Sequence, residues 1–191
     1  GQDLWLTDAS IPRRNAEGRV IGSLGIMLDI TERKRAEVRA QAFASIGEFM
    51  PRVKSPREAA EAIHEAANKL FRFDACNITM YDSSSDIITS LLMQDLVDGE
   101  RVDLTHDAPP DCPTPFGRTV LYEGSQLILR KAADSSGPMK GIGTKNQRSN
   151  SLMFAPMRRS QGPIGYISIQ SYSYNAYSER DLADLQALAD H

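Results

Sequence analysis

The sequence predicts an α+β fold in which an antiparallel sheet is flanked by helices, and in which a β-hairpin and a long helix precede that sheet. Two patterns carry this prediction. Alternation of apolar and polar residues recurs in neighbouring pairs of segments, and apolar residues spaced three and four apart recur near the beginning, in the middle and at the end. After the first hairpin and its helix, the expected order is helix, two strands, small helix, strand, long loop, two strands and helix.

The composition is that of an ordinary globular protein. The 191 residues are 41% hydrophobic and 25% charged, and a formal net charge of −3 gives no reason to expect a nucleic acid or an anionic membrane as partner. No apolar run approaches the roughly 20 residues that cross a bilayer. Two cysteines, Cys76 and Cys112, are too few for a disulfide framework. We therefore expect a cytoplasmic protein, of which this chain is one part.

A hairpin is expected from residues 3–12 and 19–29. Leu24, Ile26 and Leu28 alternate with smaller or more polar residues, which indicates a strand with one buried face, and the segment 15–18 between the arms has the composition of a turn. A lone hairpin is marginal in water. These strands therefore need a further partner, which pairing with a second chain could supply.

Two helices follow. The segment from about 31 to 53 carries an apolar stripe, and Pro51 predicts a break near its end. Ser55 as N-cap, Pro56 at the first helical position and Glu58 as capping-box partner then predict a second helix over 55–71. The stripe consists of Val38, Ala42, Phe43, Ile46, Phe49, Met50 and Val53.

The remaining elements alternate between strands and helices. We expect Ser178 to cap a final helix that buries one leucine-rich face. That face consists of Leu182, Leu185, Leu188 and Ala189. The expected strands are 74–82, 86–93, 125–130, 151–159 and 164–172, a short helix is expected over 115–123, and long loops are expected over 94–113 and 131–150.

The segment NSLMFAPMRRSQGPIGYISIQSYSYNAYSERDLADLQALAD resembles the closing half of a GAF domain. The shared features are a strand that ends in a proline, a glycine that opens the next strand, and an aromatic residue four positions before an aspartate at the final helix. In this chain they are Pro156, Gly165, Tyr177 and Asp181. Together with the helix of 55–71 and the strands of 74–93, the resemblance covers roughly residues 40–191 and implies a GAF-like fold.

The opening segment WLTDASIPRRNAEGRVIGSLGIMLDITERKRAE resembles the C-terminal end of a PAS domain, its last two strands and the Asp-Ile-Thr step formed by Asp29, Ile30 and Thr31. In that family this step couples the sheet to an exit helix. Asp29 or Thr31 can accept hydrogen bonds from the free N–H groups of the helix start. We expect movement of the hairpin to be transmitted to the helix, because the junction leaves no slack.

These resemblances imply three parts: the end of a PAS domain over 1–30, a signalling helix over 31–54 and a GAF domain over 55–191. Such strings occur in bacterial sensor proteins. We expect the sensory input part of a signal transduction protein, such as a sensor histidine kinase, that forms a parallel homodimer through the linker helix and binds a small molecule. Any catalytic output domain would lie outside this chain. The alternatives are a GAF-fold enzyme that uses Cys76 or Cys112, and a GAF domain that only dimerises.

The sequence lacks complete motifs for a zinc, bilin, cyclic-nucleotide or haem site. His106 and Cys112 are two residues without the second pair that a zinc site needs, and Pro113 stands where a bilin-binding cysteine has its histidine. Tyr177 and Asp181 match half of the GAF pattern for cyclic nucleotides, but Leu182 replaces its glutamate. No residues indicate haem, and the cofactor stays unknown.

A ligand pocket is expected between one face of the sheet and the loops 94–115 and 131–150. Its expected lining is mainly aromatic, with one cation as polar anchor. The residues are Tyr81, Met93, Phe116, Arg148, Phe154 and Tyr166.

Overall fold

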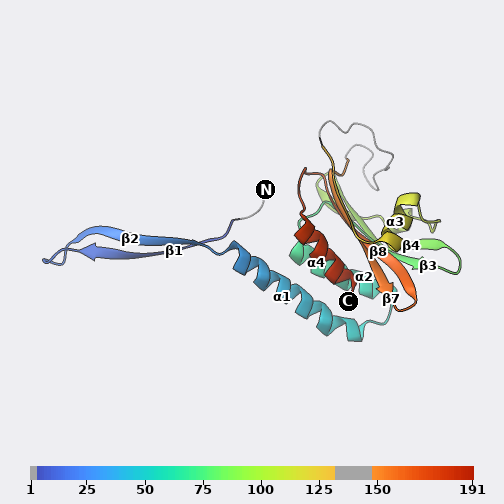
Figure 1. The fold of residues 1–191 in the computed structure, drawn as a ribbon, viewed down its shortest axis with the longest axis horizontal. Coiled ribbons are helices and arrows are strands. Elements are labelled where there is room, and N and C mark those ends of the chain that lie inside the picture. Colours follow the sequence, from blue (N-terminus) through green and yellow to red (C-terminus); the bar gives the residue numbers. More distant parts are fainter. Residues whose placement is uncertain (1–3, 132–147) are drawn as a thin grey trace. The chain divides into compact units, whose positions relative to one another are not determined.

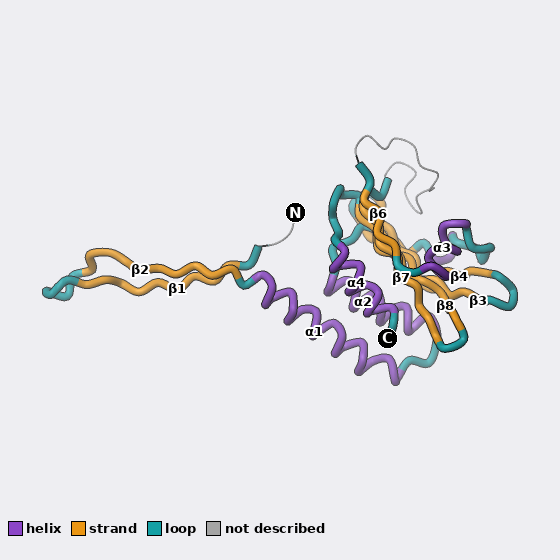
Figure 2. The backbone as a smooth tube through the Cα atoms, viewed as in Figure 1, coloured by secondary structure: helices purple, strands orange, loops and turns teal. Residues whose placement is uncertain are grey.

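The computed structural model describes residues 4–131 and 148–191, and the chain divides into two compact units, residues 1–41 and 42–191. Figures 1 and 2 show the ribbon and the backbone trace. No helix among the described residues is long and apolar enough to cross a membrane. The expected loop of 131–150 falls largely outside the described residues.

The first unit contains a hairpin of β1 (Leu6–Arg14) and β2 (Val20–Asp29), followed by the start of α1 (Thr31–Phe49). The two strands pair antiparallel, and Gly18 takes the positive φ that the turn requires. Cross-strand partners share one face, so the pair Ile11 and Leu24 lies beside Ile26 on a single apolar face. All three side chains are more than half exposed.

The second unit begins within α1 and continues into α2 (Pro56–Leu70). Pro51 lies in a short 3₁₀ turn, Met50–Arg52, which confirms the predicted break. The Ser55 side chain caps α2 by accepting a hydrogen bond from the Glu58 N–H at 3.2 Å, but the Glu58 carboxylate accepts from the Lys54 N–H. The predicted reciprocal capping box is therefore displaced by one residue.

The apolar stripe predicted along α1 lies on one face of the helix, but only part of it is buried. Ala42 and Ile46 are buried, whereas Val38 is 39% and Phe49 47% exposed. At about 100° per residue, these four side chains lie within roughly 80° of one another around the helix. Ile46 therefore packs into the core of the second unit, while Val38 and Phe49 on the same face present apolar side chains to solvent.

A sheet of six antiparallel strands forms the centre of the second unit, in the order β5-β4-β3-β8-β7-β6. Its strands are β3 (Ala75–Asp82), β4 (Ile87–Val97), β5 (Glu100–Asp103), β6 (Gln126–Leu129), β7 (Ser151–Arg159) and β8 (Gly162–Ser171). The predicted strand of 86–93 is longer, and part of the predicted loop of 94–113 is strand. Asp98 and Gly99 both have positive φ and form the tight turn between β4 and β5, a turn that an Asp-Gly pair favours.

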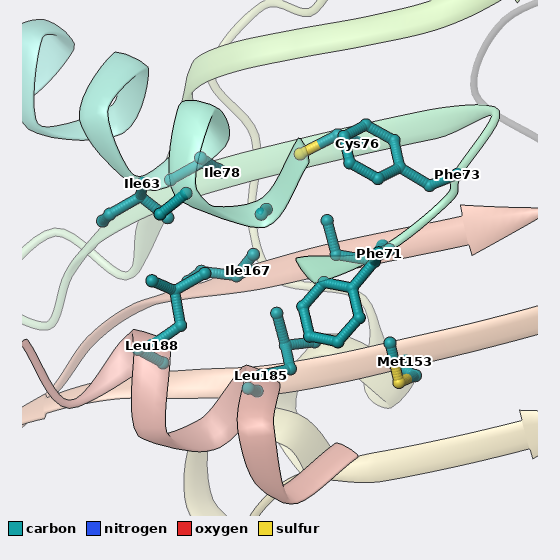
Figure 3. Packing of buried hydrophobic residues seen from close by; sticks show 14 of the residues in the cluster. Ile63, Phe71, Phe73, Cys76, Ile78, Met153, Ile167, Leu185 and Leu188 are labelled. Atoms are coloured by element: carbon teal, nitrogen blue, oxygen red, sulfur yellow. The ribbon is translucent and has the colours of Figure 1, made fainter. Parts of the chain in front are cut away.

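Two helices cover one face of the sheet and α3 (Pro115–Glu123) covers the other (Figure 1). On the first face, α2 and α4 (Glu179–Ala189) enclose the main core, in which Leu185 and Leu188 face Ile167 on β8 (Figure 3). Ser178 and Asp181 form a reciprocal capping box at the start of α4. The predicted buried face of this helix is confirmed, because all four of its residues are buried.

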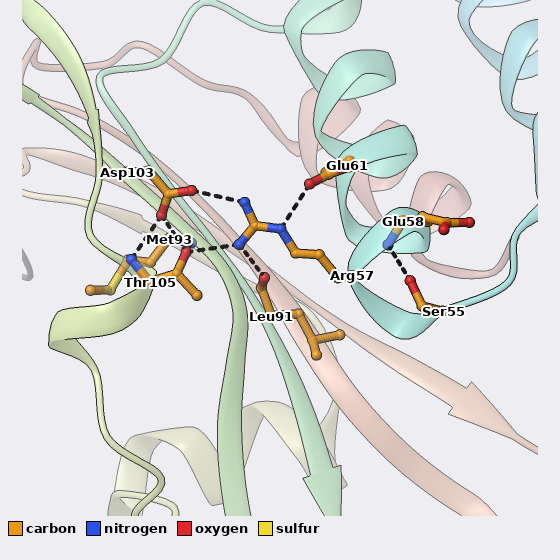
Figure 4. Close-up of polar contacts among 8 residues, drawn as sticks. All are labelled: Ser55, Arg57, Glu58, Glu61, Leu91, Met93, Asp103 and Thr105. Carbon is orange, nitrogen blue, oxygen red and sulfur yellow. Dashed lines mark hydrogen bonds and ion pairs between the residues drawn. The ribbon is translucent and has the colours of Figure 1, made fainter.

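Arg57 ties the start of α2 to the sheet (Figure 4). Its guanidinium donates at 2.8 Å each to Glu61, to the backbone carbonyl of Leu91 and to Asp103. Burial raises the pKa of Asp103, but hydrogen bonds from Thr105 and Arg57 outweigh it and lower the pKa to about 2. The charged form of Asp103 therefore stabilises the folded state.

We expect Asp103→Asn to flatten the acid dependence of stability. A carboxyl group whose pKa is lower in the folded state contributes stability above its unfolded pKa, about 4, and this contribution is lost as pH falls toward 2. Urea midpoints measured between pH 5 and pH 2 should fall less for the variant than for the unmodified chain. Asp107→Asn, at an exposed aspartate four residues further on, is the control; equal slopes for Asp103→Asn and the unmodified chain would contradict the expectation.

Candidate functional site

The face of the sheet beneath α3, here called the α3 face, carries a continuous row of side chains across five strands. Cross-strand pairing places Gln126, Phe154, Ser168, Asn77 and Met93 in register, one from each of β6, β7, β8, β3 and β4. Partners in register share a face. Two residues predicted to line a pocket, Phe154 and Met93, therefore lie in the same row, and the polar residues between them were not predicted.

An aromatic cluster lies between this row and α3. The rings of Phe116 and Phe154 meet edge to face with centroids 4.9 Å apart, and those of Phe154 and Tyr166 are 6.3 Å apart. Gly117 lies close to the Tyr166 ring, since a Cβ there would be 3.8 Å from it. Three of the predicted lining residues thus meet at one place, and a methyl group at position 117 of α3 would contact one of them, Tyr166.

Polar side chains lie buried on the same face. The Ser149 hydroxyl donates to Gln170 Oε1 at 2.8 Å, and Gln170 Nε2 donates to the Ser168 hydroxyl at 2.9 Å. The Ser90 hydroxyl donates to Asn77 Oδ1 at 3.2 Å. Neutral amides and hydroxyls in a protein interior need hydrogen-bond partners. This polar chain therefore gives the α3 face directional recognition groups beside an aromatic surface.

An ion pair holds α3 to the hairpin of β3 and β4. Arg118 on α3 donates at 2.9 and 2.6 Å to the two carboxylate oxygens of Asp86, and hydrogen bonds from Arg118 and Tyr81 lower the pKa of Asp86. Tyr81, which the sequence places in the pocket, also lies 3.0 Å from the Tyr122 hydroxyl. Hydrogen bonding to Tyr122, burial and the Asp86 carboxylate raise the pKa of Tyr81. Tyr81 therefore anchors α3 at the border of the aromatic cluster.

Arg148 lies immediately before the buried Ser149, whose hydroxyl donates to Gln170. The neighbouring residues 132–147 lie outside the described part of the chain. A role for Arg148 as the polar anchor of a ligand stays a prediction.

The two cysteines differ in their surroundings. Cys76 is buried in the core beneath α2 and α4, and burial raises the pKa of its thiol to about 12. Cys112 lies exposed on the segment before α3. A thiol with so high a pKa is a poor nucleophile near neutral pH.

A metal site was not predicted from the histidines, and the surroundings of His64 are those of a packed side chain. His64 packs edge to face on Phe73, and burial and the Arg101 cation lower the pKa of its imidazole. Within residues 4–131 and 148–191, no group of three or more His, Cys, Asp or Glu side chains is placed to hold a metal ion.

The junction of the hairpin and α1 is closed by hydrogen bonds within the first unit. Ile30 alone separates β2 from α1. The Thr31 N–H donates to Asp29 Oδ1 at 2.8 Å, and the Trp5 N–H donates to the Thr31 hydroxyl at 2.9 Å. Hydrogen bonding from the side chain and the N–H of Thr31 lowers the pKa of Asp29. The Ile30 N–H donates to the Trp5 carbonyl oxygen at 2.8 Å. Thr31, the first residue of α1, is thereby bonded to the end of β2 and to the residue that precedes β1.

Comparison with known proteins places the second unit in a family. The family model for the GAF domain matches residues 53–191. Comparison with curated proteins gave no match. One similar solved structure is the GAF domain of a phosphoenolpyruvate-protein phosphotransferase from Coxiella burnetii, with a TM-score of 0.57 and 15% identity over 82% of this chain and 89% of that one.

Two further structures share the fold. Residues 122 to 287 of a methyl-accepting chemotaxis protein have a TM-score of 0.55 and 17% identity over 78% of this chain and 92% of that one. Free methionine-R-sulfoxide reductase from Neisseria meningitidis has a TM-score of 0.54 and 17% identity over 81% of this chain and 83% of that one. Since the family model matches more than half of its residues, the chain belongs to the GAF domain family.

Proposed function

We propose that the chain is the sensory part of a bacterial signal transduction protein, such as the input region of a cytoplasmic sensor histidine kinase. In this proposal, the GAF domain of residues 55–191 binds a small molecule on its α3 face. The helix of residues 31–54 connects it, in a parallel homodimer, to the end of a PAS domain formed by residues 1–30. The signal is a shift between two arrangements of the paired helices, each populated in the free protein.

The observation that carries this proposal is the partly exposed apolar stripe of α1. Ala42 and Ile46 are buried, and Val38 and Phe49 leave apolar side chains exposed on the same face of the helix. An exposed apolar strip along a helix is suited to pairing with an identical helix. Phe49 also borders a groove of about 230 Å³ between α1 and α2. A second copy of α1 would bury both.

The junction at Thr31 supports coupling to the hairpin. Hydrogen bonds among Trp5, Asp29, Ile30 and Thr31 replace the loop that would otherwise absorb movement. The exposed apolar face of β1 and β2 supports membership of a larger sheet, because a two-stranded ribbon with such a face is not stable alone. We propose that the remaining strands of a PAS domain cover this face.

A regulatory role fits the site better than catalysis. Cys76 lies beneath α2 and α4 and its thiol is protonated at neutral pH, while the aromatic cluster and the polar chain lie on the α3 face. The similarity to a chemotaxis protein agrees with a sensory role, and the similarity to a reductase shows that the same fold also supports enzymes.

Disulfide crosslinking tests the proposed dimer. In a Cys112→Ser background, Val38→Cys and Phe49→Cys should each form a covalent homodimer under mild oxidation, scored on a non-reducing gel. The two positions are about 16 Å apart along the helix. Both can pair with themselves only where the helices run parallel.

Arg33→Cys is the matched control, because Arg33 lies roughly 140° around the helix from Val38 and is exposed. It should crosslink more slowly than Val38→Cys. Self-crosslinking at only one of the two test positions would indicate an antiparallel or crossed pair, and a chain that stays monomeric at high concentration would remove the basis of the relay.

A further inference from the structure

The side-chain amide of Asn77 is buried and only half satisfied. Asn77 is 6% exposed, and its Oδ1 accepts from the Ser90 hydroxyl. Among the described residues, no acceptor lies within hydrogen-bond distance of its Nδ2. A buried N–H group without an acceptor destabilises the fold, so a group in this state at a binding surface indicates a ligand that supplies the acceptor.

Two further donors lie beside Asn77 on the α3 face. Ser168 is its cross-strand partner, fully buried, and its oxygen accepts from Gln170 while its own O–H has no acceptor within the described part of the chain. The Tyr166 phenol, on the same face two residues along β8, likewise has no hydrogen bond to a described residue. Asn77 Nδ2 and the hydroxyls of Ser168 and Tyr166 therefore offer three donors on this face, whereas Asn77 Oδ1 and Ser168 Oγ each already accept a hydrogen bond.

The surroundings of these donors favour an uncharged ligand over an anion. The row from Gln126 to Met93 contributes no ionisable group that is charged at neutral pH. Two residues along β4 from Met93, the buried Asp95 accepts a hydrogen bond from the Tyr172 hydroxyl and would repel an anion. The nearest cation described on α3, Arg118, is engaged in two bonds to Asp86. An anion on this surface would lose its hydration without compensation.

The aromatic cluster defines the shape of the ligand. Phe116 and Tyr166 both present their rings edge to face toward Phe154, which stands next to Ser168 in the row. Such rings pack well against a further planar ring. The apolar body of a ligand would lie against Phe154 while its acceptor reaches Asn77.

From these groups we infer the ligand class of the proposed sensory site: an uncharged, planar aromatic or heteroaromatic compound that carries a carbonyl-type oxygen. Asn77 Nδ2 and the Ser168 hydroxyl donate to that oxygen, and Phe154 and Tyr166 contact the ring. The inference rests on the proposed function, since it takes the α3 face as the ligand site. It adds the chemical class of the ligand.

Three small probes of similar size test the inference: acetophenone, which has the ring and the carbonyl; ethylbenzene, which lacks the oxygen; and benzoate, which is charged. Each is titrated into the ¹⁵N-labelled chain by NMR. Acetophenone should shift the side-chain NH₂ pair that is absent from the spectrum of Asn77→Leu, in a saturable manner. Ethylbenzene should bind about tenfold more weakly, the factor that corresponds to one hydrogen bond of about 1.4 kcal/mol. Benzoate should also bind more weakly, because its charge would lose hydration without compensation.

Asn77→Leu keeps the approximate volume of the side chain and should reduce the preference for acetophenone over ethylbenzene, because only the Ser168 hydroxyl is left to donate to the oxygen. Ser168→Ala provides the same comparison if Asn77→Leu does not fold. Asn68→Leu, at an exposed asparagine on α2, is the matched control and should retain the preference for acetophenone.

Two contrary outcomes are separable. Tighter binding of benzoate, with shifts in the signals of Phe154 and Tyr166, would overturn the ligand class and leave the α3 face as a binding site. Shifts in none of the α3-face signals with any probe would overturn both the ligand class and the proposed sensory site.

Discussion

Alanine in place of Gly165 is expected to lower the free energy of unfolding of the second unit by about 3–5 kcal/mol, the sum of backbone strain and overpacking. Gly165 has φ +152°, and a Cβ there would lie 2.0 Å from the Thr79 carbonyl oxygen and 2.9 Å from the Met157 methyl group. The Thr79 oxygen belongs to the backbone of the adjacent strand and cannot move aside without opening the pairing of β3 and β8. Urea unfolding followed by circular dichroism measures the loss.

Gly162→Ala separates backbone strain from collision. Gly162 is on the same strand and has φ +125°, but a Cβ there would have no neighbour within 4 Å. This variant should lose only about 1–2 kcal/mol. Equal losses at the two positions would show that contact with Thr79 is not the reason for glycine at 165.

Leu185→Ala is expected to destabilise the second unit by about 2–5 kcal/mol, because it leaves a cavity in a well-packed interior. Leu185 on α4 is completely buried in the core that α2 and α4 form with the sheet (Figure 3). The result is measured as a shift of the urea midpoint without a change in the slope of the transition.

The control for this prediction is Leu129→Ala on β6. Leu129 is 40% exposed, so the same truncation should cost less than about 1 kcal/mol. A loss for Leu185→Ala no larger than that of Leu129→Ala would mean that α4 is not held by this core.

Local patterns predict the fold well where one face of an element is buried. The leucine-rich face of α4 and the cap at Ser178 follow from spacing alone, since solvent covers the opposite side of that helix. The strand β5 was missed because Asp98 and Gly99 stand among polar residues, and the polar composition of the segment outweighed the turn that an Asp-Gly pair forms. The exposure of Val38 and Phe49 could not be predicted, because helical spacing identifies an apolar stripe but does not say what covers it.

The candidate site was only partly predictable. The aromatic residues Phe116, Phe154 and Tyr166 stood out by type, and the structure brings them together. Asn77 and Ser168 did not stand out in the sequence. A polar residue that alternates with apolar residues in a strand is expected to face solvent, whereas in the structure both side chains are buried on the α3 face. The ion pair of Arg118 with Asp86 joins residues that are 32 positions apart, and a local sequence pattern cannot predict such a contact.

Successive side chains of β3 and β8 point alternately to the α3 face and to the core beneath α2 and α4, which couples these two sides of the sheet. Asn77 stands between Cys76 and Ile78, and Ser168 stands between Ile167 and Ile169; the four flanking side chains all belong to the core beneath α2 and α4. The two strands thus separate the α3 face from the helical layer by the thickness of one backbone. A ligand that displaced the amide of Asn77, as proposed above, would act directly on the side chains that pack against α2 and α4.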